Sequence, residues 1–355
     1  MTSLPRRVPE RLQDIAHVQS AYEICLRLEE FLQMAADNGD DVKKELVYVR
    51  TLGYLMHCVP TDLGLKKVVE EIASSVDDSA ILAVGQMYYD HFIRAFRANR
   101  AHIPTPSNYS SPAARRSFDK IQDWVNNETM PEVPQSHSQA KNHALIRDGH
   151  RCVVTGHYDT NSVMAIKELK EVVESDPSTM VERTHCTHIF PDSPIEPDKA
   201  ERQYAATMWA VMFGFGYENL PDELNGSKIH RLENIMTLVL GFHMAFDQMD
   251  IWFAATEEMN KYKLGASDPL FLRGYPEFVT FTTHDPEKYP VPSPTYLAIH
   301  AACAKVAHLS GAAARIDEFY RNMEDGETLD PNGASANMLE HAIFELQVAG
   351  YGVTT

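Results

Sequence analysis

The sequence is short of cysteine and of positive charge, and it has no long apolar run. Its five cysteines include no CxxC pair, which argues against a disulfide framework and against a four-cysteine zinc knuckle. No stretch approaches the ~20 apolar residues of a membrane helix. The polar start, residues 1–12, lacks the apolar segment of a signal peptide. We therefore expect an intracellular chain, cytoplasmic or nuclear, with no membrane partner.

Acidic residues outnumber basic residues by 50 to 32, so the formal net charge is −18. Because a phosphate backbone is bound mainly through Lys and Arg, this balance disfavours nucleic acid as a partner. A small-molecule substrate is left open, and nothing in the sequence fixes the oligomeric state. Hydrophobic residues make up 44% of the chain and charged residues 23%, which is the balance of a globular protein with a sizeable core.

Several widespread catalytic motifs are missing as well. The sequence has no GxSxG elbow, no Walker A sequence and no HExxH pair. The run Phe213-Gly214-Phe215-Gly216 contains a GxG, but it lacks the third glycine and a preceding strand. A dinucleotide site is therefore not expected.

Apolar residues at helical spacing dominate the first part of the chain. They recur over 12–28, 46–55 and 80–98, which predicts three helices. A proline-bearing loop over 101–115 and a short helix over 118–125 are expected to follow. We interpret the polar stretch 128–140 as a linker, so that residues 1–127 form a helical N-terminal domain.

After Lys141 the pattern changes to short runs of β-forming residues. These runs, which predict strands, lie at 152–154, 185–190, 251–253, 262–264 and 278–281. A charged segment, 167–176, separates the first two runs, and helices are predicted at 198–213, 296–323 and 337–348. We therefore predict an α+β protein with a mixed module at 141–255 and a C-terminal region, 256–355, of strands that ends in helices.

Three pieces of the middle region, taken in order, could carry chemistry. They are Leu145-Ile146-Arg147-Asp148-Gly149-His150-Arg151-Cys152-Val153-Val154-Thr155-Gly156, Cys186-Thr187-His188-Ile189-Phe190-Pro191, and the stretch from Glu233 to Asp247. In a helix, His243 and Asp247 at positions i and i+4 would project from one face and could bind one divalent ion. His188, near the end of a predicted strand, could as a neutral imidazole take a proton from water. The amide of Asn234 could tie a loop backbone or hold His188 in place.

Each of these residues also has a structural interpretation. A His-x-x-x-Asp pair is common on helix surfaces, and a histidine near a strand end is more often structural than catalytic. An asparagine before an apolar run usually caps or turns the chain. The order and spacing of all four residues favour the functional interpretation, which is a metal ion, a histidine base and a positioned water acting on a phosphodiester.

Together the three pieces resemble the HNH endonuclease family, in particular the branch, common in fungal proteins, with the pattern CxxTG … AHIxP … NxxxLxxxxHxxFD. The matching residues are Cys152, Thr155, Gly156, His188, Ile189, Pro191, Asn234, Leu238, His243, Phe246 and Asp247. The resemblance covers about a third of the chain and implies an embedded ββα-metal module with a divalent metal ion, Mg²⁺, Mn²⁺ or Zn²⁺, as cofactor.

The resemblance also implies roles for four residues. His188 corresponds to the general base, Asn234 to the asparagine that braces the loop, and His243 to a metal ligand, while Asp247 takes the second ligand position on the helix. Thr187 stands where many members have Asp or His as a metal ligand, and a hydroxyl is a poor substitute. Other donors nearby are Glu182, Asp192 and His185, the last expected on the opposite strand face from His188.

The charge of the module gives a further constraint. Residues 141–255 contain ten Lys or Arg and seventeen Asp or Glu, and the basic cluster near the predicted site is Arg147, Arg151 and Arg183. Three hypotheses therefore stand. The first is a metal-dependent HNH-type hydrolase of phosphodiesters, and the second is an HNH scaffold used in small-molecule biosynthesis, as in specialised metabolism. The third is a non-catalytic interaction protein that works through its helices.

Overall fold

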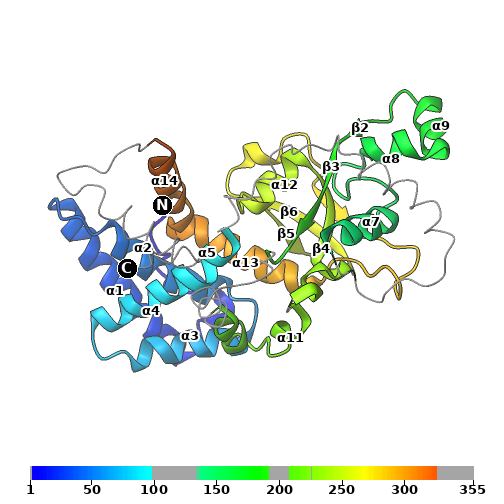
Figure 1. Cartoon of the computed structure of the whole chain (residues 1–355). Helices are drawn as coiled ribbons and strands as arrows, with labels where there is room; N and C mark the ends of the chain where they lie inside the picture. The colour runs from blue at the N-terminus through cyan, green and yellow to red at the C-terminus, as the bar shows by residue number, and fades with distance from the viewer. Residues whose placement is uncertain (1, 98–133, 135, 192–207, 225, 326–355) are drawn as a thin grey trace, which may run out of the picture. The chain divides into compact units, whose positions relative to one another are not determined.

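The computed structural model describes residues 2–97, 134, 136–191, 208–224 and 226–325 (Figure 1). The helices predicted at 118–125 and 337–348, the loop at 101–115 and most of the linker at 128–140 lie outside the described residues. The chain divides into two compact units. The first draws on 1–96, 193–222 and 301–355, and the second on 97–192 and 223–300.

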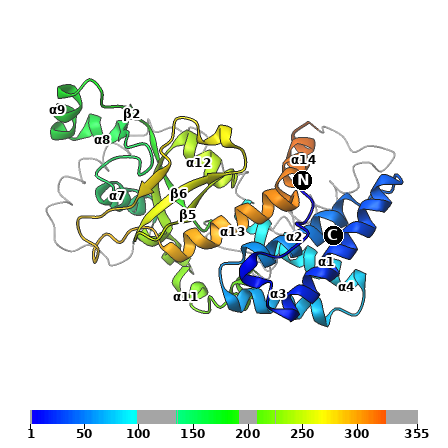
Figure 2. The same ribbon diagram turned by 180° about the vertical axis from the view of Figure 1, so that it is seen from behind.

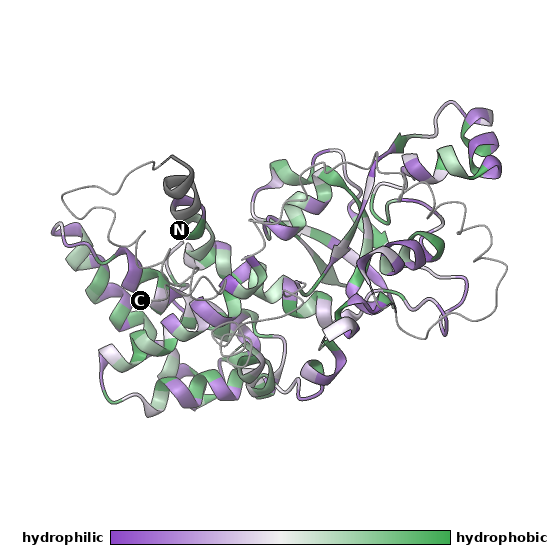
Figure 3. Ribbon diagram, viewed as in Figure 1, coloured by the Kyte–Doolittle hydropathy of each residue, from purple (hydrophilic) through white to green (hydrophobic). Residues whose placement is uncertain are grey.

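The first unit is built from helices, three of which cover the predicted stretches, whereas the helix over 62–74 was not predicted. The helices are α1 (Ala16–Asp37), α2 (Lys43–Cys58), α3 (Asp62–Ser74), α4 (Asp78–Tyr88) and α5 (Arg94–Arg97), with a π-helical turn at Tyr89–Ile93 between the last two. Thr61 caps α3 by accepting a hydrogen bond from the Gly64 amide at 3.0 Å, and Asp77 caps α4 in the same way. In Figure 3 hydrophobic and hydrophilic stretches alternate along these helices, as in amphipathic helices that pack on a core.

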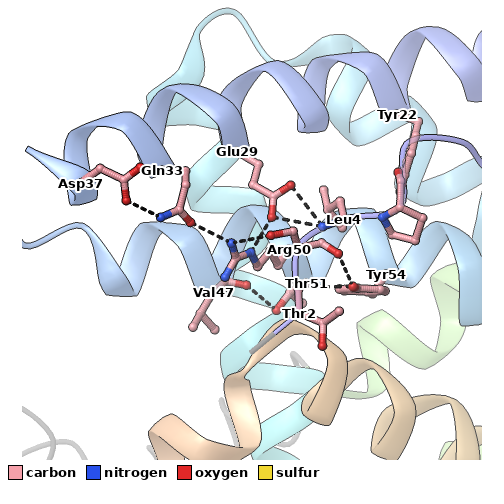
Figure 4. Close-up of polar contacts among 12 residues, drawn as sticks. Thr2, Leu4, Tyr22, Glu29, Gln33, Asp37, Val47, Arg50, Thr51 and Tyr54 are labelled. Carbon is pink, nitrogen blue, oxygen red and sulfur yellow. Dashed lines mark hydrogen bonds and ion pairs between the residues drawn. The ribbon is translucent and has the colours of Figure 1, made fainter.

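A buried ion pair joins α1 to α2 (Figure 4). Nε of Arg50 donates to Glu29 at 2.5 Å, and both side chains are almost fully shielded from solvent. The carboxylate of Glu29 also accepts from the backbone amide of Leu4 at 3.1 Å, and Tyr54 donates to the Ser3 carbonyl at 2.7 Å. These contacts fasten the N-terminal segment onto the two helices.

Replacing Glu29 with alanine should therefore lower the free energy of unfolding of the first unit by about 3–5 kcal/mol, because it leaves the Arg50 guanidinium buried without its counter-charge. The neighbouring Glu30 pairs with Arg6 at 2.9 Å on the surface, so Glu30→Ala should cost about 0–1 kcal/mol. Urea unfolding followed by far-ultraviolet circular dichroism compares the two variants. Equal effects would show that the buried pair contributes no more than the exposed one.

The helix predicted over 296–323 is wrong in one respect, because the structure has two helices there. They are α13 (Pro294–Ser310) and α14 (Ala312–Asp325), separated by Gly311 with a φ of 87°. Glycine adopts this left-handed conformation without steric cost, so it ends α13. Among the described residues no single helix could cross a membrane by length and apolar character, and α13 with the start of α14 passes that test only as a pair bent by 76°.

The second unit contains three small sheets and several helices. The strands are β1 (Tyr158–Asp159), β2 (Val181–Glu182), β3 (Thr184–His188), β4 (Ile235–Val239), β5 (Ile251–Ala255), β6 (Lys261–Ala266) and β7 (Phe278–Thr280). β1 pairs with β2 in parallel, β3 with β4 antiparallel, and β5, β6 and β7 form an antiparallel sheet, seen from behind in Figure 2. The helices are α7 (His137–Arg147), α8 (Thr160–Ala165), α9 (Lys167–Ser175) and α12 (Leu240–Asp247), and the boundary between the units falls within α11 (Leu220–Leu224). The α+β prediction is confirmed.

Four of the five predicted strands are present, as β3, β5, β6 and β7. The strand predicted at 152–154 is wrong, because this run forms a turn. The amide of Gly156 donates to the Cys152 carbonyl at 2.9 Å, and the Thr155 amide donates to the Cys152 sulfur at 3.4 Å. The charged segment 167–176 is mostly the helix α9 rather than a connection.

The element that positions the site is the succession β3, β4, α12. The two strands pair from Thr184 opposite Val239 to His188 opposite Ile235, and the chain runs from β4 directly into α12. Ile235, Leu238 and Phe242 are completely buried, so the β3–β4 strand pair and the helix share one core. The ββα arrangement expected for the middle module is therefore present.

A buried fork holds α7 against this element. The Arg147 guanidinium donates to Asp148 through Nε at 2.7 Å, and it donates to the carbonyls of Leu232, Ile235 and Pro290. Asp148 in turn accepts from the Thr237 amide of β4 at 3.2 Å. The conspicuous Arg-Asp dipeptide is thus a structural clamp.

Candidate functional site

The four predicted residues lie around the β3–β4–α12 element. His188 is the last residue of β3, Asn234 directly precedes β4, and His243 and Asp247 lie on α12. Because His188 is paired with Ile235 in the ladder, Asn234 lies next to the end of β3. The fold therefore gathers residues that are as much as 59 positions apart in the sequence.

Asn234 fixes the loop that follows β3. Its side chain is fully buried. The Oδ1 atom accepts from the Phe190 amide at 2.8 Å, and Nδ2 donates to the carbonyls of Phe190, at 3.1 Å, and Ile229, at 2.9 Å. One side chain thus satisfies three buried backbone groups, which holds the residues after His188 in a single conformation.

His243 and Asp247 contact each other along α12. Nε2 of His243 lies 2.9 Å from Oδ2 of Asp247. His243 is only 9% exposed, whereas Asp247 is open to solvent. Nδ1 of His243 is buried and has no hydrogen-bond partner among the residues that the structure describes. With Nε2–H donated to Asp247, Nδ1 keeps its lone pair, so this atom is suited to bind a metal ion.

His188 contacts other histidines. Its Nε2 lies 3.1 Å from Nδ1 of His230, and its ring centroid is 5.6 Å from that of His137, the first residue of α7. Burial lowers the pKa of His188 to about 3, and the nearby His137, His230 and His243 add to this effect. The imidazole is therefore neutral at physiological pH.

His185 occupies the other face of β3. Because side chains alternate along a strand, its ring points away from the His188 side, as the sequence predicts. That face is the one that meets α12, since the His185 and His243 ring centroids are 5.5 Å apart. Burial, followed by the charge of His243, lowers the pKa of His185 to about 4.

The structure thus brings His243 and Asp247 into contact, and it places His188 with His230 and His137. His243 lies beside His185, on the face of β3 opposite the group of His188, His230 and His137. Sequence reasoning missed His137 and His230. The available signal was the count of sixteen histidines, five of which gather here, but no local spacing marks those two as partners of His188.

The other predicted donors are less well placed. Glu182 lies 3.0 Å from Nδ1 of His157, in a surface pair, and Asp192 falls outside the described residues. Thr187 is buried, and its hydroxyl has no hydrogen-bond partner within the described ranges. Over those same ranges, no three or more His, Cys, Asp or Glu side chains are arranged to hold a metal ion. The feature that fits a metal is the buried, unshared Nδ1 of His243.

The basic cluster predicted near the site is smaller in the structure. Arg147 is buried in its clamp and has no surface to offer a phosphate. Arg151 lies over the Tyr158 ring, 4.0 Å from the centroid, and Arg183 is exposed. Arg147 therefore adds no exposed positive charge to this cluster, because its guanidinium donates to backbone carbonyls and to Asp148.

Comparison with known proteins supports the predicted resemblance. Residues 152–254 match the family model HNH_2, described as HNH endonuclease. The matched range runs from the Cys152 turn to β5 and includes all four predicted residues. No curated protein and no solved structure matches the chain. The chain therefore contains an HNH endonuclease-like module, for which a nuclease-like function is indicated at the level of the family.

Proposed function

We propose that the HNH endonuclease-like module hydrolyses phosphodiester bonds with the help of a divalent metal ion. The observation that carries the proposal is the ββα element itself, within the matched region. It presents a neutral histidine at a strand end whose following loop is tied by Asn234, and a helix histidine with a buried, unshared ring nitrogen. These are the parts that water activation and metal binding require.

Each residue has a defined task in this proposal. His188 accepts the proton of the attacking water, which a neutral imidazole can do. Asn234 keeps the loop after His188 in place, so that the base and the scissile bond stay aligned. His243, hydrogen-bonded to Asp247, forms the metal-binding end of the site. The bound ion would polarise the phosphoryl oxygens and stabilise the charge that develops on them.

The test is a cleavage assay with the purified full chain. Supercoiled plasmid and single-stranded RNA are incubated with the protein after chelation, and then with Mg²⁺, Mn²⁺ or Zn²⁺ restored. We expect nicking or cleavage that requires one of these ions. The control variant His284→Ala should retain this activity, because His284 is an exposed residue beside Tyr289. Absence of cleavage of both substrates with all three ions would contradict it for nucleic acids.

A second candidate is the same hydrolytic or related chemistry on a small molecule. It is favoured by the charge, −18 for the chain, and by the burial of Arg147, which leaves little to hold a long phosphate backbone. Deleting the gene should then change the profile of small metabolites in the producing organism. An unaltered profile, together with plasmid or RNA cleavage, would decide for the nuclease.

A further inference from the structure

We propose that His185 and His243 together bind the metal ion, with Asp247 orienting His243, and that the ion is of the zinc class rather than magnesium. This inference rests on the proposed function for the location of the site. The strand ligand is then His185, which lies two positions before Thr187, the ligand position implied by the family resemblance, and on the same strand face.

The ring geometry supports one ion between the two histidines. Their centroids are 5.5 Å apart, with planes inclined by 39°. Two imidazoles that bind one tetrahedral ion at ~2.0–2.1 Å from each nitrogen place their centroids about 5–6 Å apart. The observed separation lies within this range, so the two rings are close enough to share one ion.

The alternation of side chains along β3 explains why His185 can act as a metal ligand. His185 and Thr187 share the strand face that meets α12, whereas His188 lies on the other. Two buried polar atoms of this region, Oγ1 of Thr187 and Nδ1 of His243, have no hydrogen-bond partner among the described residues. A neutral hydroxyl is a weak ligand, so an imidazole one pleat earlier takes over the coordination.

Asp247 then acts through His243. Its carboxylate, 2.9 Å from Nε2, accepts a hydrogen bond from Nε2–H, which leaves the Nδ1 lone pair available to the ion. Such carboxylate–histidine–metal arrangements fix the tautomer and the ring orientation of the ligand. Two imidazoles leave the remaining positions for water or substrate oxygens, and imidazole ligands favour Zn²⁺, Fe²⁺ or Ni²⁺ over Mg²⁺.

The experiment measures metal binding, not activity. The full chain is stripped with a chelator, titrated with Zn²⁺ by calorimetry, and its metal content is determined by elemental analysis. Wild type should bind one Zn²⁺ per chain. His185→Ala and His243→Ala should each weaken binding by at least about 100-fold, and Asp247→Asn by about 10–100-fold, as for partners of metal-bound histidines.

Two matched variants lie on the same strand. Thr187→Val removes the hydroxyl at nearly constant volume and should keep wild-type affinity. His188→Ala removes a histidine from the opposite face and should keep it too. Thermal unfolding of each stripped variant shows whether it is folded, and His185→Asp, which retains a ligand, should recover binding with a shift toward Mn²⁺.

Three results would overturn the inference. They are no Zn²⁺ binding by wild type, unchanged binding in His185→Ala, and loss of binding in His188→Ala or His230→Ala alone, which would place the ion on the α7 side of β3. Mg²⁺-dependent cleavage without Zn²⁺ binding would leave the proposed function standing. Zn²⁺ binding through His185 and His243 without hydrolysis of any phosphodiester would support the metal site and contradict the proposed function.

Discussion

Replacing His188 with alanine should lower the rate of phosphodiester hydrolysis by about 10²–10⁴-fold, because the variant loses the group that takes the proton from water. The contact with His230 uses Nε2 of His188, so the atom that accepts the proton from water is Nδ1 of His188. This requires the tautomer in which Nε2–H of His188 donates to His230. The fall should appear in kcat more than in KM, since the base acts in the transition state.

Two controls separate this role from a structural one. His284→Ala removes an exposed histidine of the same unit and should leave the rate unchanged. His230→Ala should lower kcat less than His188→Ala, because His230 positions the base without replacing it. Hydrolysis by His188→Ala at the wild-type rate, with the protein folded by circular dichroism, would rule out His188 as the base.

Replacing Arg147 with methionine should destabilise the second unit by about 3–5 kcal/mol, even though no predicted site residue is changed. The substitution leaves Asp148 buried without its counter-charge and removes the donor to the carbonyls of Leu232 and Ile235. Because these carbonyls flank Asn234, the loop that carries the base should loosen as well.

Hydrogen exchange of peptides from β3 and β4 measures this effect locally, which matters because a chain of two units need not unfold in one step. Arg183→Met, an exposed arginine just before β3, is the matched control and should change protection little. If the two variants exchange alike, the buried contacts of Arg147 are not what holds α7 to the β3–β4 strand pair.

Elements that depend on local pattern were predictable. The apolar spacing of α1 and α2, and the β-forming runs of β5 and β6, are properties of a few consecutive residues and are confirmed. Gly311 was the exception, because a helical pattern continues on both sides of it, and only its left-handed φ separates α13 from α14.

The site was predictable only in part, since its contacts are long-range. The contact of His243 with Asp247 was predictable on the condition that their segment is a helix, because the two residues form an i, i+4 pair, at 2.9 Å in the structure. The pairing of His188 with His230 spans 42 positions, and that of Arg147 with Ile235 spans 88. No periodicity encodes such pairs, because tertiary packing alone decides which faces meet.

His185 illustrates this limit. Strand alternation correctly predicts that it points away from the His188 side. That His243 lies next to this face depends on where α12 packs, and the sequence of β3 does not contain this information. From the sequence of β3 alone, His185 is a donor on the wrong face of the strand. Once α12 is in place, the same residue becomes a candidate metal ligand.

The most direct test of the account uses a substrate that needs no basic surface. The full chain is stripped of metal and given the small diester bis(p-nitrophenyl) phosphate, and the release of nitrophenolate is followed before and after a divalent ion is restored. Wild type should show no turnover without metal and clear turnover with it, and His188→Ala should lose that turnover. No hydrolysis under any metal condition, or an equal rate in His188→Ala, would contradict the claim that the β3–β4–α12 element is a hydrolytic centre.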